Sequence, residues 1–158
     1  MAEAPILYVE DEEDYQLLVV RILARSGLRV LVAGSGQEGR ELLRRQEPRL
    51  VLLDINLPDT DGYALCQAIR LDPVRAELPV LMLSVRRRPE EWLRGFSSGA
   101  TDYISKPINP SQLLERVGHA LREKPPARRE GTAPEYRLIQ AAVSGNCRSC
   151  PGMCWARF

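Results

Sequence analysis

The sequence lacks any long apolar run. No stretch of it approaches the roughly 20 consecutive apolar residues that a membrane-spanning helix needs. The N-terminus also lacks the basic start and the apolar segment that are typical of a secretory signal peptide. These absences favour a cytoplasmic protein without membrane contact.

The sequence also has little net charge, +1 over 158 residues, and few cysteines. Residues 1–123 carry 16 Lys and Arg against 19 Asp and Glu, whereas residues 124–158 carry 6 against 2. A slightly acidic body is not typical of a general nucleic-acid binder. The tail is too short for a helix-turn-helix output domain, so we expect no direct DNA binding. Cys66 stands alone in the body, and the other three cysteines crowd the last twelve residues. This distribution is not that of a disulfide framework spread over a secreted domain.

The chain does contain a regular alternation of short apolar runs and helical patterns. We expect strands over residues 6–9, 29–33, 50–53, 80–83 and 102–105, and helices over residues 15–25, 35–45, 61–70, 89–97 and 109–122. Nearly continuous apolar strands with helices between them predict an α/β fold with a parallel sheet covered on both faces. Ser35, Asp61 or Gly62, and Asn109 or Ser111 are the expected helix N-caps.

The character of the sequence changes after Leu121. Residues 4–123 are the expected domain, and residues 124–135 mix prolines and glycines with charges, which predicts a linker. Residues 136–158 form a Cys-containing C-terminal tail. There is no internal repeat.

Polar and charged residues follow the apolar strands of the expected sheet. Glu10 and Asp11 follow the first strand, Asp54 the third, Ser84 the fourth and Lys106 the fifth. Ligands of such sheets bind outside the carboxyl ends of the strands, so these residues share one edge. Clustered acids favour a hard cation such as Mg²⁺. With a lysine and a hydroxyl they suit a phosphoryl group, for which Asp54 can be the nucleophile.

Four motifs on this edge resemble the receiver domain of two-component response regulators, over about residues 4–123. They are the acidic pair after ILYV, Asp54 followed by INLPDTDG, Ser84 after VLML, and GATDYISKP with Tyr103 and Lys106. Each motif alone has little specificity, but the four occur in order, each at the end of an expected strand. The resemblance implies a flavodoxin-like, doubly wound sheet of order 2-1-3-4-5 with five helices.

The resemblance also implies a function for individual residues. Asp54 would accept a phosphoryl group from the phosphohistidine of a sensor histidine kinase or a phosphotransfer protein. Glu10, Asp11, Asp54 and the backbone carbonyl of Asn56 would hold Mg²⁺. Lys106 would contact the phosphoryl oxygens.

The resemblance also implies a conformational switch that follows phosphorylation. Ser84 would turn toward the phosphate, and Tyr103 would move inward behind it. This movement would reshape the face formed by residues 89–97, 102–105 and 109–122, which would contact an unknown output protein or a second copy of the chain. The resemblance thus implies a signalling switch and not an enzyme.

The sequence departs from the family pattern at two positions. Glu10 stands where Asp is commoner, and we expect it to reach the metal through water, with altered Mg²⁺ affinity. Ser84 replaces the commoner Thr. Arg86, with Asn56, could tune hydrolysis of the acyl phosphate, or Arg86 to Arg88 could form a solvated loop. The family pattern also implies a cis peptide bond before Pro107.

Two further side chains are expected to be structural. Cys66 is expected to pack in the core. His119, the only histidine in the sequence, is expected on a helix surface.

The tail carries a second candidate site. Cys147, Cys150 and Cys154 are spaced C-x2-C-x3-C, which suits Zn²⁺ or an iron–sulfur cluster but leaves one ligand missing. A partner chain, His119 or an exogenous group could supply it. A reactive tail, an adventitious disulfide and a docking peptide around Trp155 remain alternatives.

Two other functions compete with the switch. An aspartate-nucleophile phosphatase of the haloacid-dehalogenase type also uses Mg²⁺, but it has a second acid two residues after the nucleophile, where this chain has Asn56. A scaffold or a metal- or redox-linked adaptor would use the cysteine tail. The presence of both Asp54 and Lys106 argues against a receiver that has lost its chemistry.

Overall fold

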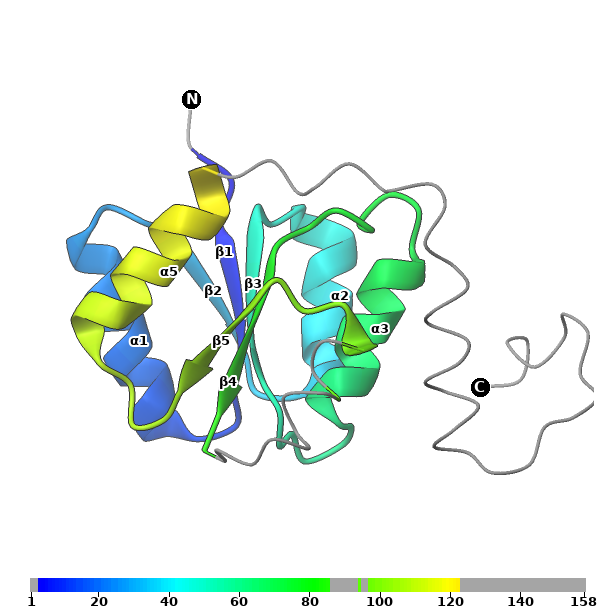
Figure 1. The fold of residues 1–158 in the computed structure, drawn as a ribbon, viewed down its shortest axis with the longest axis horizontal. Coiled ribbons are helices and arrows are strands. Elements are labelled where there is room, and N and C mark those ends of the chain that lie inside the picture. Colours follow the sequence, from blue (N-terminus) through cyan, green and yellow to red (C-terminus); the bar gives the residue numbers. More distant parts are fainter. Residues whose placement is uncertain (1–2, 86–93, 95–96, 123–158) are drawn as a thin grey trace, which may run out of the picture. The chain divides into compact units, whose positions relative to one another are not determined.

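A five-stranded parallel sheet forms the centre of the molecule. The computed structural model describes residues 3–85, 94 and 97–122, and Figure 1 shows their arrangement. The strand order is β2-β1-β3-β4-β5, which confirms the predicted order. The strands are β1 (Ile6–Val9), β2 (Val30–Ala33), β3 (Leu50–Asp54), β4 (Val80–Ser84) and β5 (Asp102–Ser105).

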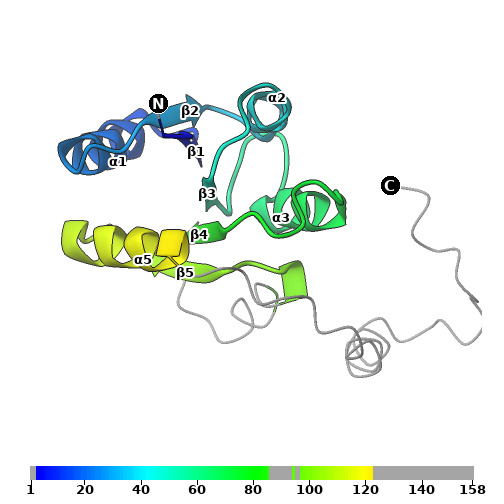
Figure 2. The same ribbon diagram turned by 90° about the horizontal axis from the view of Figure 1, so that it is seen from above.

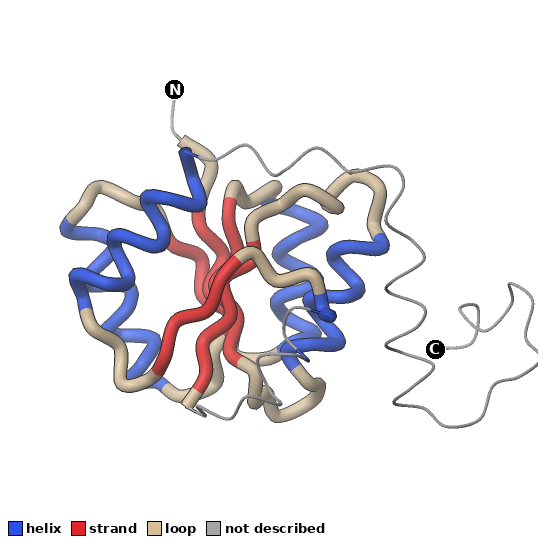
Figure 3. Tube along the Cα trace, in the orientation of Figure 1, coloured by secondary structure: helices blue, strands red, loops and turns tan. Residues whose placement is uncertain are grey.

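Helices connect the strands and cover both faces of the sheet. The described helices are α1 (Glu13–Arg25), α2 (Gly36–Gln46), α3 (Gly62–Leu71) and α5 (Pro110–Arg122). Figure 3 shows them outside the strands. Helix α1 begins two residues earlier than predicted, because Glu13 and Asp14 occupy its first turn, where the helix dipole favours acidic side chains. Most of the helix predicted over residues 89–97 lies outside the described residues.

Each strand contributes alternate side chains to two separate cores. Helices α1 and α5 lie on one face of the sheet, and α2 and α3 lie on the other (Figure 2). Ile6 and Tyr8 pack in the core under α1 and α5, whereas Leu7 and Val9 pack in the core under α2 and α3. The period of two along a strand gives this division. It also explains why β1 is apolar at every position, since both of its faces are buried.

The helix starts agree with the capping residues expected from the sequence. The Ser35 hydroxyl accepts a hydrogen bond from the backbone N–H of Glu38 at the start of α2. The Asp61 carboxylate accepts one from Tyr63 at the start of α3, and the Asn109 side chain accepts from Ser111. These contacts satisfy N–H groups that have no partner within their own helix.

The two side chains expected to be structural lie where the sequence predicts them. Cys66 is fully buried in the core under α3, and His119 is exposed on α5, as predicted. The linker at 124–135 and the cysteine tail lie outside the described residues. Among the helices that the structure describes, none has the length and apolarity needed to cross a membrane.

Candidate functional site

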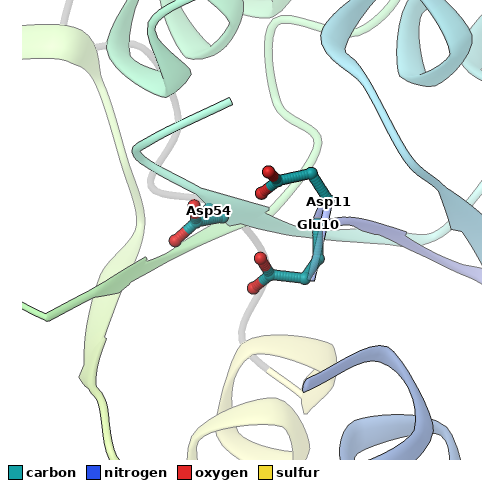
Figure 4. A group of neighbouring side chains, drawn as sticks. All are labelled: Glu10, Asp11 and Asp54. Carbon is teal, nitrogen blue, oxygen red and sulfur yellow. The ribbon is translucent and has the colours of Figure 1, made fainter. Parts of the chain in front are cut away.

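The parallel sheet brings the predicted site residues to one edge. Glu10 and Asp11 follow β1, Asp54 ends β3, Ser84 ends β4 and Lys106 follows β5. Figure 4 shows Glu10 and Asp11 reaching from the end of β1 toward Asp54. One carboxylate oxygen from each of these three residues lies within 4.8 Å of the others. The predicted convergence of the acids is therefore confirmed.

Lys106 joins two of these acids. Its Nζ lies 2.6 Å from Glu10 Oε2 and 3.1 Å from Asp54 Oδ1. The ammonium group also lies 4.1 Å from the centroid of the Tyr15 ring, a cation–π distance. The peptide bond between Lys106 and Pro107 is cis, as the family pattern implies. The lysine is only 4% exposed, so its charge is balanced almost entirely by protein groups.

Glu10 is buried and hydrogen-bonded, although it begins a run of acidic residues that could have been a solvated loop. Its side chain is fully buried, and its Oε2 accepts a hydrogen bond of 3.1 Å from the Tyr8 hydroxyl. Its Oε1 accepts one of 3.3 Å from the backbone N–H of Glu12, and Gln16 donates to its backbone carbonyl. The carboxylate thus lies between Tyr8 and Lys106. Asp11, in contrast, is exposed and faces solvent.

Burial changes the protonation of the site. Burial raises the pKa of Asp54 and of Glu10, although the Lys106 ammonium opposes both shifts. Burial also disfavours the charged form of Lys106, but the hydrogen bond from Lys106 to Glu10 and the charge of Asp54 outweigh it, so its pKa is raised. Lys106 is therefore a permanent cation at neutral pH. The site holds three carboxyl groups and one ammonium group.

The raised pKa of Asp54 predicts a pH-dependent cost to stability. A carboxyl group whose pKa is higher in the folded state favours folding at low pH, and that contribution is lost as pH rises through the folded pKa. We expect Asp54→Asn to unfold like the wild type near pH 4 and to become progressively more stable than it as pH rises toward 7. Urea denaturation of both proteins in EDTA measures this difference. A wild type that gains stability over the variant with rising pH would contradict the assignment.

Hydrogen bonds hold the loop after β3 at its base and at its tip. The backbone N–H of Asn56 donates to Asp54 Oδ2 over 3.0 Å, and the N–H of Gly62 donates to the carbonyl of Ile55 over 2.8 Å. At the tip, Asp59 accepts hydrogen bonds of 2.8 Å from the backbone N–H groups of Gly36 and the following residue, at the start of α2. These bonds lower the pKa of Asp59. The loop that carries Asn56 is thereby tied to a second helix.

The two predicted switch residues lie on neighbouring strands. Ser84 is the last residue of β4, and its backbone carbonyl accepts a 2.8 Å hydrogen bond from the N–H of Lys106. Tyr103, on β5, is half-buried against the core under α2 and α3, and burial raises its pKa. The structure therefore places Ser84 at the site edge and Tyr103 one strand away. Their roles in switching stay predictions.

Several residues of the site were not predicted from the sequence. They are Tyr8, Tyr15 and Gln16, which contact Glu10 or Lys106, and Asp59, which caps α2. A signal for Tyr8 was present, because residues two apart on a strand point to the same face, as Tyr8 and Glu10 do. The other contacts join residues of different elements, and local patterns contain no comparable signal for them.

The chain matches a known protein family and curated relatives. Residues 6–118 match the family described as the response regulator receiver domain. RpaA of Synechocystis sp., a DNA-binding dual master transcriptional regulator, is 38% identical over 117 residues, which are 74% of this chain and 48% of RpaA. PhoB of Pseudomonas aeruginosa, a phosphate regulon transcriptional regulatory protein, is 31% identical over 91% of this chain and 63% of PhoB. The chain thus spans about half the length of the first curated relatives it matches.

Solved structures show the same fold. A response regulator from Chloroflexus aurantiacus J-10-fl superposes with a TM-score of 0.74 at 32% identity, covering 77% of this chain and all of that one. The chemotaxis protein CheY4 of Vibrio cholerae gives a TM-score of 0.72 at 29% identity, with 76% and 100% covered.

The residues of the site fit a magnesium ion. Carboxylate oxygens from three residues converge, and Mg²⁺ prefers hard oxygen ligands arranged around a few carboxylates and waters. The exposed carboxylate of Asp11 leaves one side open to water. The excess of carboxyl groups over the single Lys106 ammonium favours a cation.

Proposed function

Because this chain belongs to the response regulator receiver family, we propose that Asp54 accepts a phosphoryl group and that the domain transmits this event through protein contacts. The observation that carries the proposal is the contact between Asp54 and Lys106, 3.1 Å apart and both buried, beside a cluster of two further acids. The arrangement provides a nucleophile, a permanent cation and a metal site within one small edge of the sheet.

The chemistry of the proposed transfer follows from these groups. A carboxylate oxygen of Asp54 attacks phosphorus, the bond between phosphorus and the donor atom breaks, and an acyl phosphate forms on Asp54. The Lys106 ammonium, already 3.1 Å from Oδ1, balances the negative charge of the phosphoryl oxygens. The Ser84 hydroxyl can donate a hydrogen bond to the same oxygens. Burial of Asp54 and Lys106 limits the contact of these two groups with water, which strengthens their interaction with the phosphoryl oxygens.

Glu10, Asp11, Asp54 and the carbonyl of Asn56 are the proposed ligands of Mg²⁺. When bound, the ion would neutralise charge on the phosphoryl oxygens. Asp11 and Asp54 are the best placed to bind it directly. Glu10 is held by Tyr8 and Lys106, which supports the expectation that it acts on the ion through water.

The proposed output is a change of surface near β5 and α5. Ser84 would follow the new phosphoryl charge, and Tyr103 would repack behind it, which is a two-state element biased by a local charge. A histidine kinase or a phosphotransfer protein is the proposed donor. The proposed output partner is another protein or a second copy of this chain. DNA binding in relatives such as RpaA is named for the whole protein, and we propose no DNA contact for residues 4–123.

The direct test is stoichiometric labelling. With acetyl phosphate and Mg²⁺, the intact mass of the wild type is expected to rise by one phosphoryl group, located on the peptide that contains Asp54. Excess EDTA is expected to abolish the gain, since the acids then repel the phosphoryl oxygens. An unchanged mass with Mg²⁺ present would refute the proposal. Continuous release of phosphate from a small phosphomonoester would favour a phosphatase instead.

The cysteine tail is not part of the proposed function. Cys147, Cys150 and Cys154 lie outside both the described residues and the segment matched to the family. A Zn²⁺ or iron–sulfur site there stays a prediction. Metal analysis of the purified chain and of its Cys→Ser variants tests it.

A further inference from the structure

A pocket of about 350 Å³ opens on the same edge of the sheet as the acidic site. It adjoins Asn56, which follows Asp54 by two residues, and Ser84, which ends the neighbouring strand. Ile55, Leu57 and Tyr63 line it, together with Thr60, Asp61 and Arg94. The proposed mechanism uses Ser84 and the carbonyl of Asn56 and assigns no role to the rest of the pocket.

Arg94 supplies the pocket with a positive charge. Its guanidinium carbon lies 6.0 Å from the centroid of the Tyr63 ring, so the aromatic face supports the group at the edge of the cavity. The side chain is exposed, and no ion pair joins it to a carboxylate among residues 3–85 and 97–122. A guanidinium in this situation is suited to a carboxylate ligand, which it can bind through two parallel hydrogen bonds.

Asp61 is the acid that shares the pocket with Arg94. Its Oδ1 accepts a 2.8 Å hydrogen bond from the backbone N–H of Tyr63. It also caps α3, where the positive end of the helix dipole offsets part of its charge. Its carboxylate therefore binds the helix start, whereas Arg94 forms no ion pair with an acid among residues 3–85 and 97–122.

We infer that this pocket binds the acyl portion of a small acyl phosphate, with Arg94 binding the carboxylate released from the donor. The inference rests on the proposed phosphorylation of Asp54. In phosphoryl transfer the attacking and leaving oxygens lie roughly in line through phosphorus. A leaving group therefore lies on the far side of phosphorus from the attacking Asp54 oxygen, and Asn56 and Ser84 border a cavity on this edge of the sheet that can receive it.

The reaction balances without any further reactant. An Asp54 oxygen forms a bond to phosphorus, the bond between phosphorus and the acyl oxygen breaks, and the electron pair of that bond leaves on the carboxylate. With acetyl phosphate the products are the Asp54 acyl phosphate and acetate, and no proton is transferred. Negative charge develops on the leaving oxygen as the bond breaks, so the Arg94 guanidinium favours this step electrostatically.

Two phosphoryl donors separate this role from a general effect on Asp54. Acetyl phosphate releases a carboxylate, whereas phosphoramidate releases ammonia. We expect Arg94→Ala to lower the second-order rate constant for acetyl phosphate by about threefold to fivefold, which corresponds to an exposed charge pair. The rate constant for phosphoramidate is expected to stay unchanged. Arg44→Ala removes an exposed arginine of α2 and serves as the matched control, with no expected effect on either donor.

The rate constants with the two donors either support or overturn the proposed role of Arg94. A selective loss with acetyl phosphate, weaker at high salt because exposed charges are screened, supports it. An equal loss with both donors, or no loss with either, overturns it and leaves the phosphorylation of Asp54 intact. A wild type that neither donor labels overturns the proposed function, and the inference with it. The thermal unfolding midpoint of Arg94→Ala, expected to equal that of the wild type, shows that the variant is folded.

Discussion

Asp54→Asn is expected to lose all labelling by acetyl phosphate and all response to beryllofluoride with Mg²⁺. The amide of Asn is no nucleophile for phosphorus, and its neutral oxygen also gives Mg²⁺ a weaker ligand than a carboxylate. In the wild type, a ligand that binds the folded state at a hundred times its Kd stabilises it by about 2.7 kcal/mol. Thermal unfolding with and without beryllofluoride measures this increase, which is expected to vanish in the variant.

Asp54→Asn is also expected to affect the stability of the folded protein when no ligand is bound. Asp54 is only 3% exposed and its pKa is raised by burial, so a neutral side chain at this position removes a desolvation cost. The variant is therefore expected to be folded and at least as stable as the wild type at neutral pH in EDTA. Asp72→Asn, which changes an acid at the end of α3, is the matched control and is expected to keep full labelling. Labelling that persists in Asp54→Asn would place the phosphoryl acceptor elsewhere.

Gly62→Ala is expected to destabilise the protein by about 3 kcal/mol, the upper part of the range for overpacking. A Cβ atom on Gly62 would lie 2.3 Å from the carbonyl oxygen of Asp54 and 2.8 Å from the Cα of Ile55. Both are backbone atoms, and they cannot move without shifting the end of β3. The glycine therefore permits α3 to begin directly against the segment that carries the proposed phosphorylation site.

The control for this substitution is Gly118→Ala on α5. A Cβ at Gly118 would meet only the end of the flexible Arg122 side chain, at 3.7 Å or more. Replacing a helical glycine by alanine is worth about 0.5–1 kcal/mol, so this variant is expected to be slightly more stable than the wild type. Urea denaturation of the three proteins measures both effects. Equal stability of Gly62→Ala and the wild type would show that β3 and α3 adapt more easily than their packing indicates.

Local sequence patterns determined the elements and most of the site. Five apolar runs form the five strands, and the Ser35, Asp61 and Asn109 side chains are caps. An apolar run and a capping residue are both patterns of residues close together in the chain. The strand order and the identity of the site residues came from four motifs in their order. Placing each motif at a strand end was enough to predict that the acids and Lys106 would meet.

Only the tertiary structure decided how these groups are held. Lys106 contacts Glu10 across 96 positions of sequence, and Asp59 caps a helix more than 20 residues earlier. Contacts of this kind depend on strand register and on the distance between neighbouring elements, and no pattern within one segment contains them. The contacts of the Glu10 side chain are an example of what only the tertiary structure decides. The sequence identified it as a departure from the family, whereas the fold showed that this carboxylate lies between the Tyr8 hydroxyl and the Lys106 ammonium.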